Sequence, residues 1–278
     1  MAKIAVTSYA GPTAPRARML ARGNGWSVAE VVCTLGPRDR PFEERHACAS
    51  IAMVLAGSFQ YRSRTGRDLM MPGSLMLGSA GQTFECSHEH GHGDRCIAFS
   101  YTPEFFDRME AAPVFRALRL PPIRALSPII ARVAASAADG SGTCWEELGI
   151  QLAGQVVELD RGISTETANP SPGAIARVAR LVRAIEQDGS RRYELRALAR
   201  ETRLSPYHFL RTFEAVTGVT PHQYLLRMRL RQAALRLSGE NSKIVDIALD
   251  AGFGDVSNFN RMFRAEFGVS PGIWRRHR

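Results

Sequence analysis

A short segment at the end of the first third of the chain concentrates side chains that bind soft metal ions. It places Cys86, His88, His90, His92 and Cys96 within 11 residues. Thiolate sulfur and imidazole nitrogen suit zinc, copper(I), nickel or iron, and two Cys with two His satisfy a tetrahedral zinc ion. The segment therefore predicts a site for zinc or another transition metal at these five residues, with no other cofactor indicated.

Two other interpretations of the segment stay open. Its spacing matches no standard zinc motif, and Gly91 and Gly93 favour a flexible loop beside which Cys86 and Cys96 are buried without a ligand. Alternatively, the two thiols form a switch that responds to oxidants or electrophiles, because a neighbouring His⁺ or Arg95 lowers a Cys pKa. The remaining cysteines are expected to be buried in the core: Cys33, Cys48 and Cys144.

The elements that position this segment are strands. Short apolar runs separated by Gly and Pro over residues 27–102 favour an antiparallel sandwich or small barrel. The expected strands are Ala29–Leu35, Ala47–Tyr61 with a bend at Gly57, Leu69–Met71, Leu75–Leu77 and Arg95–Tyr101. Residues 1–26 show no clear period and are expected to form an arm with a mobile start. Small-molecule binding inside the barrel stays open, with lining candidates that are also ordinary core residues: Met53, Leu55, Phe59, Met76 and Phe99.

Two helices are expected after the strands, at Ser127–Ala138 and Cys144–Leu159, because their apolar residues recur at helical spacing. The second helix carries a seam close to a heptad: Trp145, Leu148, Leu152, Val156 and Leu159. This seam either packs on its own domain or forms the interface of a homodimer.

The charge of the chain is unevenly placed. Residues 1–172 contain 17 Lys or Arg and 17 Asp or Glu, so the whole net charge of +9 lies in the last 106 residues. A polar segment with two Pro and two Gly, Arg161–Gly173, coincides with this shift and is expected to be a linker. A basic second half suggests nucleic acid or an anionic surface as its partner.

The basic region nearly repeats itself with an offset of 50 residues. Each copy has a short helix, a tight turn, and a second helix that ends at Gly218 or Gly268. Seven residues are identical in the two copies: Phe209/Phe259, Arg211/Arg261, Phe213/Phe263, Ala215/Ala265, Gly218/Gly268, Val219/Val269 and Pro221/Pro271. The Phe pairs at i,i+4 bury one face of the second helix, and the opposite face is polar. This pattern is typical of the helix-turn-helix.

Residues 174–276 resemble the DNA-binding domain of the AraC/XylS family of transcription regulators. The motifs that carry the resemblance are Leu195-x-x-Leu198-Ala199, Leu204-Ser205-Pro206, Phe209-x-Arg211-x-Phe213 and Gly218-Val219-Thr220-Pro221-x-x-Tyr224, then Ile244-x-Asp246-Ile247-Ala248, Gly252-Phe253, Ser257-x-Phe259-x-Arg261-x-Phe263 and Phe267-Gly268-Val269-Ser270-Pro271. The resemblance implies a seven-helix domain whose two recognition helices enter successive segments of the major groove.

The resemblance also implies which residues face the bases: Tyr207, His208, Leu210 and Arg211 in the first helix, and Val256, Ser257, Asn258, Asn260 and Arg261 in the second. The chemistry fits, because Arg pairs with guanine in a bidentate manner, Asn with adenine, and Val or Leu contacts a thymine methyl group. For Arg211 and Arg261, contact with phosphate alone is the alternative.

The first half resembles the family only in layout, as a cupin-like barrel that binds an effector, followed by helices that dimerise. His46 lies where a cupin His pair would begin, but neither a second His nor a spaced Glu follows. The whole chain is thus predicted to be an α+β protein with an effector-sensing and dimerisation domain (1–160), a linker (161–173) and a DNA-binding domain (174–278). The implied partners are double-stranded DNA, a second copy, RNA polymerase, and an effector that is a small molecule, a metal or a redox signal.

Other classes of function find less support. No Ser/His/Asp set, phosphate-binding Gly loop or paired-carboxylate motif stands out, so we expect no enzyme. The alternative is a metal-dependent cupin-type enzyme fused to a DNA-binding domain. Five Cys in 278 residues make no disulfide scaffold, and no signal peptide or apolar run of 18 residues is present. We therefore expect a cytoplasmic protein without a membrane partner.

Overall fold

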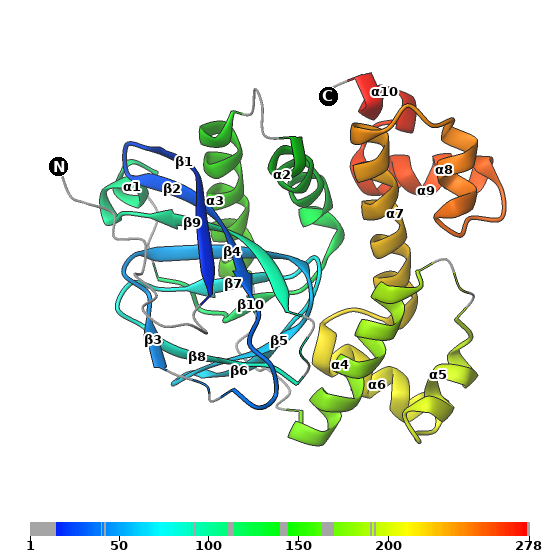
Figure 1. Ribbon diagram of the computed structural model, residues 1–278, viewed down its shortest axis with the longest axis horizontal. Coiled ribbons are helices and arrows are strands. Elements are labelled where there is room, and N and C mark those ends of the chain that lie inside the picture. The colour runs from blue at the N-terminus through cyan, green and yellow to red at the C-terminus, as the bar shows by residue number, and fades with distance from the viewer. Residues whose placement is uncertain are drawn as a thin grey trace. The chain divides into compact units, whose positions relative to one another are not determined.

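The computed structural model describes residues 15–39, 41, 43–89, 91, 93–109, 114–139, 144–162, 170–189, 191 and 193–276. The chain forms two compact units. The first contains residues 1–121 and 142–168, and the second contains residues 122–141 and 169–278. The fold class is confirmed, since the first unit is rich in strands and the second is helical (Figure 1).

The strand-rich unit contains two antiparallel sheets. Their order is β1-β2-β9-β4-β7-β10 and β3-β8-β5-β6. The strands are β1 (Arg16–Gly23), β2 (Trp26–Cys33), β3 (Glu43–Arg45), β4 (Ala49–Ala56), β5 (Phe59–Ser63), β6 (Gly66–Met70), β7 (Leu75–Gly78), β8 (Thr83–Ser87), β9 (Asp94–Tyr101) and β10 (Arg119–Leu120). The expected barrel is therefore corrected to two open sheets, and no closed barrel is found among the residues that the structure describes.

The core of this unit lies between the two sheets. β4 and β9 pair in the middle of the larger sheet, and their register partners Val54 and Cys96 are buried in one cluster with Phe59, Tyr61 and Phe84 of the smaller sheet. The expected bend at Gly57 is present, with a φ of 79° that glycine adopts without strain. The prediction that residues 1–26 form an arm with a mobile start is wrong for its described part, because β1 pairs with Trp26–Val32 of β2.

The helices of the first unit are α1 (Pro103–Arg108) and α3 (Trp145–Arg161). Leu148, Leu152 and Val156 of the expected dimer seam are buried in this unit, whereas Trp145 and Leu159 are half-buried. The Tyr101 hydroxyl fixes the helix to β9 by donating to the Gly149 carbonyl over 2.9 Å. The buried seam residues stabilise their own unit. Dimerisation through α3 stays a prediction, and it has to use the exposed side of the helix.

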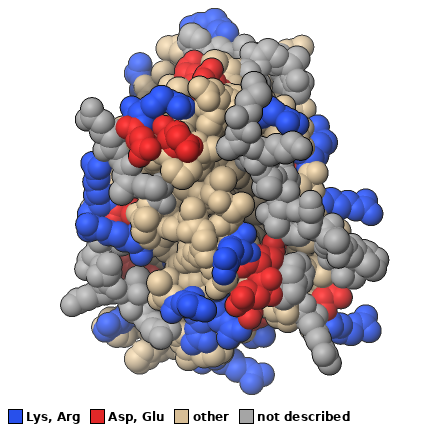
Figure 2. All heavy atoms as spheres, turned by 90° about the vertical axis from the view of Figure 1, so that its left-hand side faces the viewer, with Lys and Arg blue, Asp and Glu red and all other residues tan. Residues whose placement is uncertain are grey.

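Charged side chains are mixed on the surface drawn in Figure 2, where Lys and Arg lie among Asp and Glu around a patch of other residues. In the strand-rich unit, Arg18 pairs with Glu30 and Arg62 pairs with Glu85. This mixture agrees with the balanced charge of residues 1–172.

The second unit is helical. It contains the 3₁₀ turn η1 (Arg124–Leu126) and the helices α2 (Ser127–Asp139), α4 (Pro172–Gln187), α5 (Leu195–Glu201), α6 (Pro206–Thr217), α7 (Pro221–Gly239), α8 (Ile244–Asp250), α9 (Val256–Phe267) and α10 (Pro271–Arg276). None of the helices that the structure describes is long and apolar enough to cross a bilayer.

Helix α2 belongs to the second unit, although the sequence led us to expect it in the first domain. Ala131 joins a buried cluster with Leu230 and Ala234 of α7 and Phe263 of α9. The predicted boundary at residues 161–173 is therefore not the only point at which the chain passes from one unit to the other. Residues 122–141, from the first half of the chain, also belong to the helical unit. Most of that predicted linker, residues 163–169, lies outside the described residues.

Candidate functional site

The first helix-turn-helix consists of α5 and α6. The Ser205 hydroxyl caps α6 by accepting from the backbone N–H of His208, and Gly218 ends the helix in the left-handed conformation with a φ of 77°. Phe209 and Phe213 are fully buried one turn apart. Because they fix one face of α6 to the core, the opposite face is left to solvent.

The second helix-turn-helix, α8 and α9, repeats this construction. The Asp255 carboxylate accepts from the Asn258 backbone N–H over 2.7 Å, and Gly268 ends α9 with a φ of 79°. The two turns differ by one residue. The left-handed residue of the first turn is Arg203, with a φ of 56°. The left-handed residue of the second turn is Gly252, with a φ of 83°. The sequence offset is therefore 49 residues up to this turn and 50 after it.

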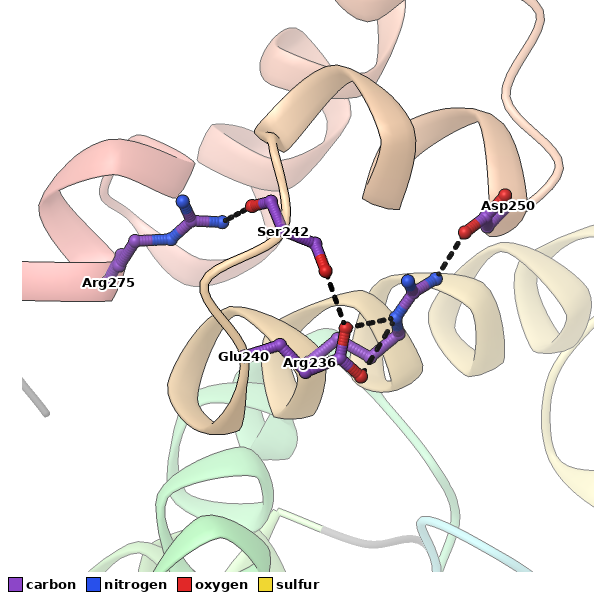
Figure 3. A network of polar contacts seen from close by, with 5 residues as sticks. All are labelled: Arg236, Glu240, Ser242, Asp250 and Arg275. Carbon is purple, nitrogen blue, oxygen red and sulfur yellow. Dashed lines mark hydrogen bonds and ion pairs between the residues drawn. The ribbon is translucent and has the colours of Figure 1, made fainter.

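A polar network holds α8 against its neighbours (Figure 3). Arg236 of α7 donates to Glu240 through Nε and to Asp250 of α8 through Nη1, over 2.9 Å in the latter case. Ser242 donates to Glu240, and Arg275 of α10 donates to the Ser242 carbonyl over 2.8 Å. These bonds connect the end of α7, the loop before α8, and α10, so they set the position of the second motif.

The long helix α7 also connects the two motifs directly. The Arg229 guanidinium donates to the carbonyls of Gly189 and Arg191, which precede α5, and to the carbonyl of Gly252 in the second turn. The distances are 2.7, 2.8 and 3.2 Å, respectively. One side chain thus bonds to the segment that precedes the first motif and to the turn of the second motif, and it helps to fix their relative orientation.

Replacing Arg229 by methionine is expected to lower the free energy of unfolding of the helical unit by about 2 kcal/mol, because three carbonyls lose a charged donor while the apolar stem is kept. Urea denaturation followed by circular dichroism measures the change. Leu235→Ala, a change at an exposed position of the same helix, is the matched control. A loss no larger than that of the control would show that the Arg229 bonds do not hold the two motifs together.

The exposed face of α6 carries the residues expected to meet DNA. Tyr207 is 63% exposed, His208 and Arg211 are exposed, and Leu210 is half-buried. The Arg211 guanidinium lies over the Tyr207 ring at 5.9 Å and donates to its hydroxyl over 3.2 Å. The Tyr207 side chain therefore holds the guanidinium on the exposed face of α6.

The equivalent face of α9 carries the second set. Ser257, Asn260 and Arg261 are exposed, and Val256 and Asn258 are half-buried. Arg261 donates to the Asn258 side-chain oxygen over 3.0 Å. In each helix an exposed arginine is held by a polar partner on the same face, an arrangement suited to reading base edges in a groove.

Comparison with known proteins agrees with this geometry. A helix-turn-helix domain family matches residues 198–277. The HTH-type transcriptional activator RhaS of Yersinia pestis (strain Pestoides F) is 33% identical over 116 residues, which are 42% of this chain and 41% of that protein. Residues 198–277 of the helical unit thus form a helix-turn-helix domain of this family. The resemblance noted from the sequence is confirmed, although the match spans only about two fifths of the length of these relatives.

Solved structures of similar proteins were also found. The DNA-binding domain of AdpA, in complex with a target DNA, is 26% identical, with a TM-score of 0.35 over 36% of this chain and 91% of that one. ToxT from Vibrio cholerae strain SCE256, bound to an unsaturated fatty acid, is 13% identical, with a TM-score of 0.38 over 92% of this chain and 96% of that one.

A second candidate site lies between the sheets of the strand-rich unit. A cavity of about 150 Å³ is lined by apolar side chains and by several titratable ones. The titratable lining residues are Cys33, Glu44, Arg45, His46, Cys48, Cys86, His88, Asp94 and Cys96. A small cavity with convergent polar groups is suited to a ligand of a few heavy atoms.

The structure separates the residues of the predicted metal segment. Cys86 on β8 and Cys96 on β9 both line the cavity, from different sheets. His88 lies just after β8 and bonds to Asp94, whereas His90 and His92 lie outside the described residues. Among the remaining cysteines Cys33 is buried as expected, but Cys48 is half-buried and Cys144 is exposed, so the prediction that these two are buried is wrong.

The thiols of Cys86 and Cys96 lack the property that a reactive switch requires. Burial raises the pKa of both well above the ordinary value, and nearby carboxylates such as Asp94 raise it further. Arg95, which was expected to lower a thiol pKa, is instead paired with Glu30. A redox response of this pair stays a prediction, and it lacks the lowered pKa on which it was based.

His46 is buried against the cavity without a charged partner. Its Nε2 lies 2.9 Å from the Tyr61 hydroxyl, and its ring stacks on Phe84 at 4.2 Å. Gly78 makes room for the ring, since a Cβ there would lie 2.2 Å from Nε2. Burial lowers the pKa of His46 to about 4, so the ring is neutral at pH 7.

The strand-rich unit is therefore expected to lose stability in mild acid. The unfolded chain takes up a proton at His46 near pH 6.5 and the folded chain only near pH 4, so the free energy of unfolding falls as pH drops through this window, by roughly 3 kcal/mol at most. Thermal unfolding at pH 7.5, 6, 5 and 4 measures this loss. His46→Gln keeps a partner for Tyr61 but cannot titrate, so its unfolding temperature should change less with pH. An identical change with pH in the two proteins would show that His46 does not cause the loss of stability in acid.

Proposed function

We propose that this chain is a sequence-specific DNA-binding transcription regulator whose two helix-turn-helix motifs read neighbouring segments of one duplex. The observation that carries the proposal is that each of the two recognition helices presents an exposed arginine at the equivalent position, Arg211 in α6 and Arg261 in α9. The two helices are built on equivalent cores and are joined by one helix, α7. The relatives matched over this region are named transcriptional activators, and no enzyme activity is part of the proposal.

The strand-rich unit is proposed to sense an effector in its cavity. Support comes from the size of the cavity, about 150 Å³, and from the polar groups that converge on it. Dimerisation through the exposed side of α3 and contact with RNA polymerase belong to the same proposal and require separate tests, namely the mass of the chain in solution and transcription in a purified system.

Helix α2 is the element proposed to carry the signal. In sequence it lies between β10 and α3 of the strand-rich unit, but it packs in the core of the helical unit. The Ser127 hydroxyl of α2 donates to Glu266 of α9, and Arg227 of α7 pairs with the same carboxylate at 3.3 Å while donating to the Pro122 carbonyl. A shift of α2 therefore acts directly on the second recognition helix.

Selection from a random duplex library tests the function. The full chain is expected to enrich one sequence with two conserved blocks, and affinity for it should exceed that for unrelated DNA by at least a thousandfold at fixed salt. Affinity for unrelated DNA should fall steeply as salt is raised. Enrichment of no sequence, with equal affinity for all duplexes, would refute a sequence-specific regulator.

A further inference from the structure

Three potential metal ligands of different kinds converge at one end of the strand-rich unit. Cys33 is the last residue of β2, His88 directly follows β8, and Asp94 is the first residue of β9. One ligand atom from each lies within 4.8 Å of the others. All three residues are buried, with exposed fractions of 6%, 8% and 7%. The sulfur, nitrogen and oxygen atoms are thus gathered away from bulk water.

The backbone around these residues is shaped to bring them together. Cys33 and Asp94 are register partners of the antiparallel pair β2–β9. Gly93 has a φ of 74°, and a Cβ on it would lie 2.7 Å from the Cys33 carbonyl oxygen. A Cβ on Gly57 would lie 2.7 Å from the Asp94 Cα. Only glycine permits this close approach, so two positions give up a side chain to place Asp94 beside Cys33.

The third group is what distinguishes this cluster from an ordinary buried ion pair. His88 Nε2 lies 2.7 Å from Asp94 Oδ2, a bond that would satisfy both groups without a thiol. Cys33 adds a free, soft sulfur ligand to the imidazole and the carboxylate. A mixed set of sulfur, nitrogen and oxygen ligands suits zinc, which accepts all three at four-coordinate sites.

We propose that Cys33, His88 and Asp94 bind one zinc ion and leave its fourth position open to the cavity. Tetrahedral zinc places its ligand atoms roughly 3.3–3.7 Å apart, so side-chain adjustments of about 1 Å close the site around the ion. All three residues line the cavity of about 150 Å³. Three protein ligands with an open position are typical of zinc centres that bind a further ligand.

This inference extends the proposed function, because the metal would hold the effector directly, but it does not depend on DNA binding. It also differs from the site expected from the sequence. Cys86 and Cys96 line the same cavity but are not among the three converging ligands. These two cysteines therefore supply matched controls, since they are thiols of the same cavity.

The experiment measures metal affinity of the full chain under reducing conditions, by competition between the protein and a chromogenic chelator for Zn²⁺. One equivalent of Zn²⁺ is expected to bind. Cys33→Ser and Asp94→Asn should each weaken binding at least tenfold, whereas Cys86→Ser and Cys96→Ser should stay within about threefold of the parent. Circular dichroism of the metal-free variants shows whether each still folds.

Substitution with Co²⁺ gives a readout on the parent that no variant can confuse. Two features are expected: a thiolate-to-cobalt charge-transfer band in the near ultraviolet, which reports the sulfur ligand, and intense visible d–d absorption, which reports tetrahedral geometry. Absence of Zn²⁺ binding by the parent would overturn the proposal. Loss of Zn²⁺ binding in Cys86→Ser or Cys96→Ser, with full binding in Cys33→Ser, would also overturn it. The zinc ligands would then lie in the segment from Cys86 to Cys96 that the sequence indicated.

Discussion

Replacing Arg211 and Arg261 by alanine is expected to remove most of the sequence discrimination of the helical unit. Each bidentate arginine–guanine pair contributes about 1–3 kcal/mol, and the two lie on separate helices, so their losses should add to roughly 2–6 kcal/mol. Each single variant should relax the preference at one base position only. Titration of fluorescent duplexes that carry every base at the selected positions measures both effects.

The control for this prediction is Arg62→Ala, which removes an exposed arginine from the strand-rich unit and should leave the affinity for DNA unchanged. If Arg211→Ala or Arg261→Ala weakened binding to all sequences equally, the two guanidinium groups would contact phosphate rather than bases. Salt dependence separates the cases further, since loss of one phosphate contact reduces the slope of log affinity against log salt by about one.

Replacing Phe263 by alanine is expected to lower the free energy of unfolding by about 3–5 kcal/mol. The Phe263 ring of α9 is fully buried. Its centroid lies 5.5 Å from the ring centroid of Phe259, 4.5 Å from that of Phe267 and 6.0 Å from that of Trp274. Its removal leaves a cavity at the point where α9, α10 and α7 meet. The affinity for DNA should also fall, because α9 loses the packing that orients its polar face.

Urea denaturation followed by helical circular dichroism measures this loss. Asn260→Ala, an exposed change on the same helix, is the matched control for stability and should shift the free energy by less than about 0.5 kcal/mol. A change of less than about 1 kcal/mol in Phe263→Ala would mean that the two copies are not held by their aromatic cores, and the account of α9 would have to be revised.

The helix-turn-helix motifs could be predicted in detail because their signals are local. Ser205 and Asp255 cap, Gly218 and Gly268 terminate, and a buried Phe at i,i+4 defines each inner face within a single helix. Such features need only the neighbouring residues to act. The one-residue difference between the turns escaped prediction, because Arg203 adopts a positive φ that its residue type does not signal.

The strand-rich unit was predicted less well because its decisive contacts are distant in sequence. Cys33 pairs with Asp94 across β2 and β9, and no spacing rule relates them. Cys33 was therefore expected to be an ordinary core residue, whereas Cys86 and Cys96, which are close together in sequence, were expected to bind a metal. Similarly, the helical period of α2 showed that one face is buried but not which core receives it.

The spacing of the two half-sites on DNA shows whether both motifs of one chain read a single duplex at the same time. If both motifs of one chain read successive major-groove segments on one face of the duplex, the two conserved blocks should lie about one helical turn, or roughly 10 bp, apart. Inserting about 5 bp between them rotates one block to the opposite face and should reduce affinity to that of a single block. Inserting about 10 bp should cause a loss of affinity no larger than the loss caused by the insertion of about 5 bp. Unchanged affinity after the half-turn insertion would contradict simultaneous reading by the two motifs.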